Sequence, residues 1–307
     1  MKKLLLLLVS ILFIVSGCSS KPASSGKLKV VASFYPLADF AQKVGGDHVE
    51  VVNLVPTGTE VHDFELSAQD KAAILESDVF VYNGVGLESW VDDLLPTLGD
   101  KVTQVDSSKG VELIHASEEH EEGHDEHEED HDHGEYDPHI WLSVSRAKQQ
   151  MTTIYEALVA ADPDHKADYE ANYKTYAAQF DALDQEFKTQ LAGVAHHTIV
   201  VSHQAFGYLC ASYGLEQVAL EGIYAESEPD PKTLASVIEY MKTNSIKVVF
   251  AESASSTKLS DTISKETGAK VDVLYTIEAM SAEQVSAKED YLSLMRMNLK
   301  ALVNALS

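Results

Sequence analysis

The chain has 307 residues, of which 45% are hydrophobic, and its formal net charge at pH 7 is −26. Phosphate groups would repel such an acidic chain, so nucleic acid is excluded as a partner. The length is sufficient for two compact lobes, each with its own hydrophobic core.

The first 17 residues have the pattern of a secretory signal peptide. Two lysines precede a twelve-residue apolar stretch, which is too short to span a bilayer because spanning needs about 20 residues. The following Val15-Ser16-Gly17-Cys18 resembles a bacterial lipobox, which implies that residues 1–17 are removed and that Cys18 carries a lipid. Residues 18–27 then form a tether that anchors an extracytoplasmic protein to the cell membrane. Since Cys210 is the only other cysteine, no intramolecular disulfide is expected.

Residues 28–163 are predicted to form an N-terminal α/β lobe. Its short apolar runs are typical of parallel strands that are buried on both faces. The predicted strands are Leu28–Ser33, Val49–Val55, Asp78–Tyr82 and Val102–Val105. Helices are predicted between them, starting near Leu37, Ser67 and Leu87, and Ser67 with Asp70 has the spacing of a capping box.

An acidic, histidine-rich segment interrupts this lobe at residues 115–135. Between His115 and His133 there are ten carboxylates and no lysine, arginine or aromatic residue, so this segment cannot build a core. Neutral imidazoles bind zinc, copper and nickel well, and the carboxylates between them attract cations. We therefore expect an auxiliary metal-capture loop rather than a solvated acidic linker. Its histidines are His115, His120, His124, His127, His131 and His133.

A long amphipathic helix is predicted over residues 164–191, within a linking segment at 164–193. Its 28 residues would extend about 42 Å, and one stripe of the helix is apolar. A coiled-coil arm would show the same pattern, but a single such helix between two α/β halves favours a strut that packs across both. The stripe comprises Tyr169, Tyr173, Tyr176, Phe180, Leu183, Phe187 and Leu191.

Residues 194–307 repeat the alternating pattern and predict a C-terminal α/β lobe. The predicted strands are Thr198–Ser202, Gln217–Glu221, Ile246–Glu252 and Lys270–Leu274. The predicted helices are Gln204–Tyr213, Pro231–Thr243, Lys258–Thr267 and Ala287–Leu306. The fold class is therefore α/β, with two lobes that each contain a mostly parallel four-stranded sheet and flanking helices.

Three histidines outside the loop come where predicted strands have ended. His62 follows the second strand, His139 follows the metal-capture loop, and His203 directly follows the strand at 198–202. Open parallel sheets bind ligands at the carboxyl ends of their strands. Three such ligands from both halves would place a metal ion in the cleft between the lobes. A single histidine of this kind is more often an ordinary surface or core residue.

The three histidines lie in distinctive segments: PTGTEVHDFE at 56–65, DPHIWL at 137–142 and SHQAFGY at 202–208. Together with NGVGLESW at 83–90 and FAE at 250–252, these resemble segments of the metal-specific solute-binding lipoproteins of ABC transporters, also called the cluster A-I family. The histidine-rich insertion is similar to that of the zinc branch. The resemblance covers nearly all of residues 28–307. It implies two lobes joined by one long rigid helix, with His62, His139 and His203 as ligands of a metal ion held between them.

The resemblance also implies a fourth ligand. The segment LYTIE at 274–278 is similar to the position where a glutamate completes the site in zinc-type members, although Thr276 replaces a proline often found there. Glu278 is therefore expected to bind the metal, with a water molecule as the alternative. Three imidazoles and one carboxylate suit Zn²⁺, whereas manganese prefers more oxygen ligands. Protonation of imidazole near pH 6.5 should compete with the metal.

The expected function is capture of extracellular zinc by a monomer that hands it to an ABC permease, and not catalysis. A manganese-binding or other divalent-metal homologue is one alternative. A secreted zinc hydrolase would use similar ligands, but the sequence has neither a His-Glu-x-x-His nor a Gly-x-Ser-x-Gly motif, and Glu60 is its only candidate base. A surface adhesin is the remaining alternative. The other histidines are expected at the surface, and Cys210 as a buried hydrophobe; these histidines are His48, His165, His196 and His197.

Overall fold

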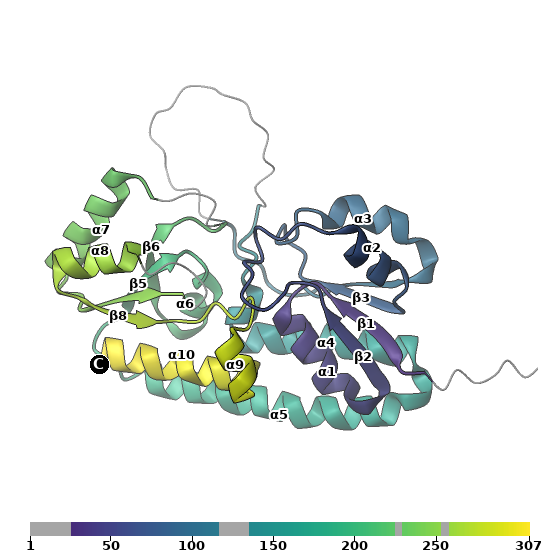
Figure 1. The fold of residues 1–307 in the computed structure, drawn as a ribbon. Helices are drawn as coiled ribbons and strands as arrows, with labels where there is room; N and C mark the ends of the chain where they lie inside the picture. Colours follow the sequence, from purple (N-terminus) through teal and green to yellow (C-terminus); the bar gives the residue numbers. More distant parts are fainter. Residues whose placement is uncertain (1–25, 117–134, 225–228, 253–257) are drawn as a thin grey trace, which may run out of the picture.

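The computed structural model describes residues 26–116, 135–224, 229–252 and 258–307. It contains two four-stranded sheets, one in each lobe, and all strand pairs within them are parallel. Helices flank both sheets, and one long helix runs beneath the two lobes (Figure 1). The predicted fold class is confirmed.

The first sheet has the strand order β2-β1-β3-β4. Its strands are β1 (Leu28–Ala32), β2 (Val49–Asn53), β3 (Val79–Tyr82) and β4 (Thr103–Asp106). Its helices are α1 (Tyr35–Gly45), α2 (Ala68–Leu75) and α3 (Val91–Leu98). The capping box of α2 is confirmed, because Ser67 and Asp70 each accept the backbone N–H of the other. Helix α3 begins at Val91, four residues after the predicted start near Leu87.

The second sheet repeats this arrangement with the order β6-β5-β7-β8. Its strands are β5 (Thr198–His203), β6 (Glu216–Glu221), β7 (Val248–Ala251) and β8 (Lys270–Val273). Its helices are α6 (Gly207–Tyr213), α7 (Pro231–Thr243), α8 (Lys258–Thr267), α9 (Ala282–Ala287) and α10 (Tyr291–Leu306). Each predicted strand is present, and no strand end differs from the prediction by more than two residues.

One predicted helix is wrong in extent. The range Ala287–Leu306 is not continuous, because Lys288 has a left-handed φ of 58° and ends α9. Asp290 then caps a new helix, α10, by accepting the backbone N–H of Ser293 at 2.8 Å. The last helix therefore starts at a new angle after a tight connection.

Helix α4 (Val144–Ala161) is a further difference, because no helix was predicted there. It packs against α1 and against the long helix α5 (Lys166–Leu191). Its buried apolar residues recur every three or four positions, which is the spacing of a core-facing helix. They are Val144, Ala147, Met151, Ile154 and Leu158.

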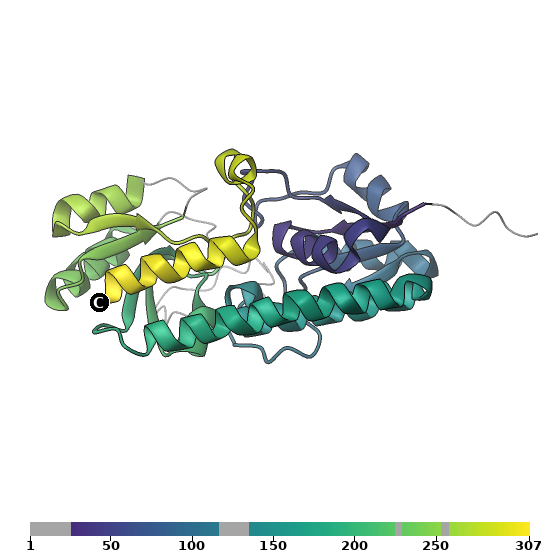
Figure 2. The ribbon, with the colours of Figure 1, turned by 90° about the horizontal axis from the view of Figure 1, so that it is seen from below.

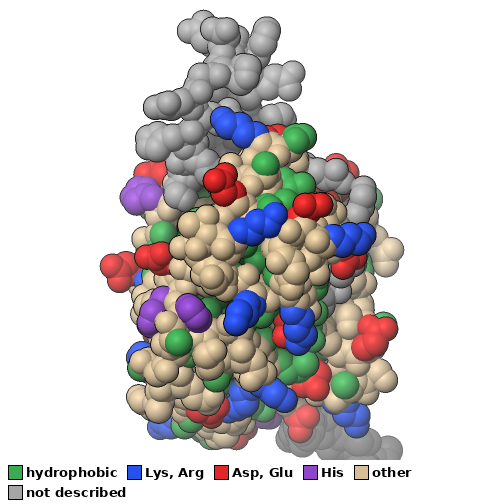
Figure 3. All heavy atoms as spheres, turned by 90° about the vertical axis from the view of Figure 1, so that its left-hand side faces the viewer, with side chains coloured by type: hydrophobic (Ala, Val, Ile, Leu, Met, Phe, Trp, Pro, Cys, Tyr) green, Lys and Arg blue, Asp and Glu red, His purple; other side chains and the backbone are tan. Residues whose placement is uncertain are grey.

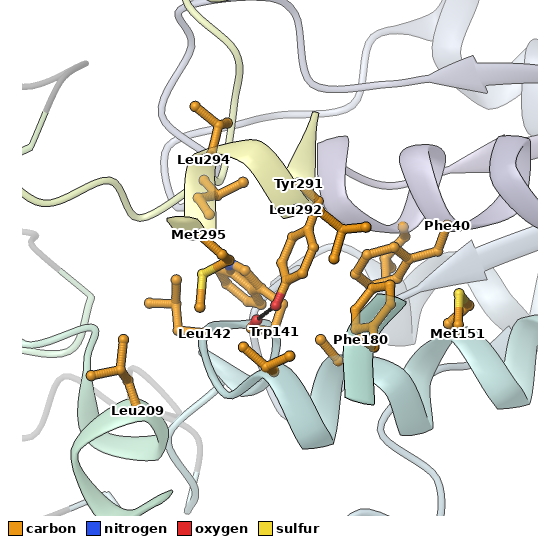
Figure 4. Close-up of a cluster of buried hydrophobic side chains, with 14 of the residues drawn as sticks. Phe40, Trp141, Leu142, Met151, Phe180, Leu209, Tyr291, Leu292, Leu294 and Met295 are labelled. Carbon is orange, nitrogen blue, oxygen red and sulfur yellow. Dashed lines mark hydrogen bonds between the residues drawn. The ribbon is translucent and has the colours of Figure 1, made fainter. Parts of the chain in front are cut away.

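The long helix α5 joins the two lobes through one continuous hydrophobic core. It runs along the whole molecule, with α10 beside it under the second lobe (Figure 2). Phe180 of α5 stacks on Tyr291 of α10, with ring centroids 5.4 Å apart, and contacts Phe40 of α1 edge-on at 5.6 Å (Figure 4). Since Phe40 and Tyr291 belong to different lobes, this core holds the lobes in one arrangement.

The end of the second lobe carries lysine, aspartate and glutamate side chains interspersed with one another (Figure 3). The strongest run of negative charge in the chain is instead the segment between His115 and His133, with its ten carboxylates.

Within the residues that the structure describes, no helix has the length and apolar character that crossing a bilayer requires. The lipobox and Cys18 lie outside the described residues.

Candidate metal centre

Four predicted ligand residues come together between the two sheets. They are His62, His139, His203 and Glu278, and each offers a donor atom within 4.8 Å of the others. His62 lies in the loop after β2, and His139 immediately precedes the short 3-10 helix Ile140–Leu142. His203 is the last residue of β5, and Glu278 follows β8. These positions agree with the rule that parallel sheets present ligands at the carboxyl ends of their strands.

Contacts between the lobes hold these loops in register. The backbone N–H of Gly58 donates to the carbonyl of Met280 at 2.9 Å, which ties the His62 loop to the Glu278 loop. The indole N–H of Trp141 donates to the carbonyl of Thr276 at 2.7 Å. Both hydrogen bonds therefore join the two lobes within a few residues of the ligands and hold the ligand-bearing loops next to each other.

The donor atoms have spacings that a small tetrahedral ion can use. The Nε2 atoms of His62 and His139 are 3.3 Å apart, and Nε2 of His139 is 3.6 Å from Oε1 of Glu278. A tetrahedral ion with zinc-to-nitrogen distances of about 2.0–2.1 Å has neighbouring donors about 3.3 Å apart. The site is also secluded: His139, His203 and Glu278 are buried, and His62 is partly exposed.

Carboxylates orient the two most deeply buried histidines. Oδ1 of Asp137 accepts hydrogen bonds from both Nδ1 and the backbone N–H of His139, at 2.8 and 2.9 Å. Nδ1 of His203 lies 2.9 Å from Oε1 of Glu252. Carboxylate partners of this kind fix the ring orientation and raise the basicity of a ligating imidazole. They leave Nε2 of His139 facing the other donors.

His203 is engaged at both ring nitrogens. Its Nε2 lies 2.7 Å from the carbonyl oxygen of Ile223, in addition to the contact between its Nδ1 and Glu252. Burial alone would lower the pKa of His203, but Glu252 and this carbonyl raise it to about 9. These two partners favour the protonated form of the ring at neutral pH, and a metal ion that binds here would have to replace a proton.

The other donors have shifted pKa values for different reasons. Burial and the two neighbouring rings hold the pKa of His62 well below its usual range, and burial with His203 does the same for His139. Burial and the nearby Glu60 carboxyl raise the pKa of Glu278. Burial thus lowers the pKa of His62 and His139, whereas hydrogen-bond partners raise that of His203, so the three imidazoles do not share the pKa near 6.5 that the sequence suggests.

The remaining candidate residues lie elsewhere. Of the loop histidines only His115 is described; it is exposed, and its ring packs 4.6 Å from that of Tyr136. His120, His124, His127, His131 and His133 lie outside the described residues. His48 and His165 are half-buried and stack 3.9 Å apart near the start of α5, whereas His196 and His197 are exposed. Cys210 is buried, as expected, and burial raises the pKa of its thiol to about 12.

Two residues of the site had no role in the sequence-based prediction. Asp137 lies two positions before His139 in the same DPHIWL motif, of which the histidine alone is predicted as a ligand. Glu252 directly follows β7, at the same end of the sheet as His203. An acidic residue at either position is a usable signal, because ligating histidines usually donate their second N–H to a carboxylate.

Comparison with known proteins identifies close relatives over almost the whole chain. Residues 30–305 match the family model of ZnuA, described as zinc-uptake complex component A, periplasmic. The zinc-binding lipoprotein AdcA of Streptococcus pneumoniae is 40% identical over 304 residues, which are 98% of this chain and 60% of that protein. The chain thus spans about three-fifths of AdcA. The high-affinity zinc uptake system protein ZnuA of Bacillus subtilis is 36% identical over 96% of this chain and 97% of its own length.

Solved structures show the same fold. The Zn(II)-bound ZnuA-like domain of Streptococcus pneumoniae AdcA superposes with a TM-score of 0.78 and 36% identity, over 92% of this chain and 99% of that one. The laminin binding protein Lmb of Streptococcus agalactiae, described as bifunctional with adhesin and metal transporting activity, gives 0.80 and 32%, over 91% and 100%. The arrangement of two sheets and one long helix is shared with these proteins.

Proposed function

The chain belongs to the ZnuA family of zinc-uptake components, and from this premise we propose that it is the extracytoplasmic zinc-binding component of an ABC importer. It captures Zn²⁺ between its lobes and delivers the ion to the permease. We further propose that it acts as a monomer and that a lipid on Cys18 anchors it to the cell membrane. Its relatives are transport components and not enzymes, so the hydrolase alternative is set aside.

The observation that carries this proposal is the set of four donors. His62, His139 and His203 with Glu278 form a cluster of three nitrogens and one carboxylate, and zinc favours such nitrogen-rich tetrahedral sites. Manganese favours more oxygen donors. We propose these four residues as the zinc ligands, with Asp137 and Glu252 holding two of the rings.

Native mass spectrometry with elemental analysis tests this function directly. Protein purified without added metal is expected to carry one tightly bound zinc ion per chain, because the site offers four donors to a single ion. A chain that binds manganese in preference to zinc, or no metal at all, would refute the proposal. Loading the metal-free protein with equal amounts of Zn²⁺ and Mn²⁺ provides the competition control.

The histidine-rich segment is proposed as an auxiliary site. It would bind ions weakly and raise their concentration near the deeper centre. Deletion of residues 115–133 is expected to reduce cellular uptake when zinc is scarce, while the purified variant still binds one ion tightly. Loss of all stoichiometric binding in this variant would show that the segment supplies essential ligands.

Zinc binding is expected to release protons at pH 7. His203, with a pKa of about 9, favours its protonated form in the metal-free protein at pH 7, and burial with the nearby Glu60 carboxyl also favours the protonated form of Glu278. A metal ligand must give up its proton to bind the ion, so at least one proton should leave per zinc ion at pH 7, and affinity should rise with pH until His203 is neutral. Calorimetric titration in buffers of different ionisation enthalpy measures this number. Release of no protons would contradict the assignment of His203 and Glu278.

A further inference from the structure

Helix α6 of the second lobe forms a hydrogen bond with Asp137, the residue that orients the first-lobe ligand His139. Tyr208, at the start of α6, is fully buried, and its hydroxyl donates to the backbone carbonyl of Asp137 at 2.8 Å. The same hydroxyl accepts the backbone N–H of Ile114 at 3.1 Å. The Tyr208 hydroxyl therefore holds together the backbone at Ile114 and at Asp137, which lie on either side of the histidine-rich segment.

The neighbouring Gly207 makes room for the Asp137 side chain. A Cβ atom added at Gly207 would overlap with Oδ2 of Asp137. Gly207 does not have a positive φ angle, so its backbone would accept any L residue without strain. What requires a glycine here is the close approach of the carboxylate whose other oxygen, Oδ1, binds His139.

The same short segment carries His203. Its carbonyl oxygen accepts the backbone N–H of Ala205 at 2.9 Å, and the N–H of Phe206 donates to Oε1 of Gln217 at 3.0 Å. These bonds give the chain between His203 and α6 a defined course. His203 is thus linked to His139 through the short segment that leads to Tyr208 and then through Asp137. In the sequence, 64 positions separate the two histidines.

Arg146 also contacts Tyr208. Its guanidinium group lies 5.1 Å from the centroid of the Tyr208 ring and donates to the carbonyl of Glu112 at 3.2 Å and to the hydroxyl of Ser212 at 3.0 Å. A cation over an aromatic face is attractive. The ring of Tyr208, a second-lobe residue, is therefore held by groups of the first lobe.

We propose that Gly207 and Tyr208 are positioning residues of the metal centre. They hold Asp137, and through it His139, at a fixed place relative to His203, so that the site is assembled across both lobes before the ion arrives. This inference rests on the proposed zinc function. It assigns to the second lobe a direct part in orienting a ligand of the first.

The variant Tyr208→Phe tests the hydroxyl. Zinc affinity, measured by competition with a chelator, is expected to fall about three- to tenfold, because one hydrogen bond to Asp137 is lost while the ring remains. Tyr213→Phe is the matched control: it lies on the same helix, and its hydroxyl donates to Asp184 of α5 at 3.0 Å. Its zinc affinity should stay unchanged. Equal effects in the two variants would overturn the proposal.

The variant Gly207→Ala tests the close approach. Affinity is expected to fall about ten- to a hundredfold, the usual cost of disturbing a partner of a metal ligand. In an Asp137→Ala background the same substitution should cost nothing further, because the carboxylate that it displaces is absent. Visible absorption of bound Co²⁺ should change in Gly207→Ala, since it reports the coordination geometry.

The inference is overturned if Tyr208→Phe and Gly207→Ala both bind zinc with wild-type affinity. It is also overturned if Gly207→Ala lowers affinity as much when Asp137 is alanine as it does in the wild-type background. Failure of the proposed function gives a different result, because then the wild-type protein itself would bind no zinc. Thermal unfolding of the metal-free variants separates a lost contact from a lost fold. The expected midpoints lie close to that of the wild type.

Discussion

Replacing His139 by alanine is expected to weaken zinc binding by about a thousandfold, or ~4 kcal/mol. His139 is fully buried, and its Nε2 lies within 3.6 Å of donor atoms on both His62 and Glu278. Loss of a partner of a ligand already costs about ten- to a hundredfold in affinity. Removal of the ligand itself should cost more, because the ion is left with an incomplete coordination shell.

The measurement compares thermal unfolding with and without zinc. At a zinc concentration about 1,000 times the dissociation constant, a ligand that binds only the folded state stabilises it by about 4 kcal/mol. For a chain of this size that corresponds to an increase in Tm of roughly 10 °C. The wild type should show this increase, and His139→Ala should show almost none.

His48→Ala is the matched control for this experiment. His48 is partly buried and, like His139, has a carboxylate neighbour, since its Nε2 lies 2.9 Å from Oδ2 of Asp168. It is not one of the four clustered donors, so the variant should retain the full zinc-induced increase. The hypothesis of a four-residue site fails if His139→Ala and His62→Ala both keep that increase.

The sheets could be predicted well from the sequence. A parallel strand covered on both faces must be apolar throughout, so segments such as Val79–Tyr82 stand out from their surroundings. The helices were harder to delimit. Lys288 interrupts the expected final helix because it has a left-handed conformation, which nothing in a lysine side chain indicates. The Asp290 cap that follows is, by contrast, a recognisable signal for the start of a helix.

The metal centre was predictable only in part. Strand ends and the family resemblance led to the three histidines, and the resemblance alone led to Glu278. Contacts between distant residues could not be inferred from patterns along the chain. The hydrogen bond from Tyr208 to Asp137 joins residues 71 positions apart, and the one from Trp141 to Thr276 joins residues 135 apart. Such pairs follow from the way the lobes pack and not from local spacing.

The second large effect is expected for Trp141→Ala, which should reduce the free energy of unfolding by about 5 kcal/mol. Trp141 is completely buried, and its ring meets that of Phe34 edge-on with centroids 4.6 Å apart. Truncation of a buried tryptophan to alanine costs about 3–5 kcal/mol. In addition, the carbonyl of Thr276 loses its indole donor, and an unmatched buried polar group costs about 1–3 kcal/mol.

Trp141→Phe separates packing from hydrogen bonding. Phenylalanine retains an aromatic ring but no N–H, so most of the packing remains while the bond to Thr276 is lost. Thr276 is two residues from Glu278, and release of its carbonyl should let the carboxylate move away from His139. We therefore expect a smaller loss of stability, about 1–2 kcal/mol, together with weaker zinc binding. Denaturant unfolding of the metal-free protein and zinc titration measure the two effects independently. An unchanged zinc affinity in a destabilised Trp141→Phe would mean that this indole supports the fold alone and leaves the position of Glu278 to other contacts.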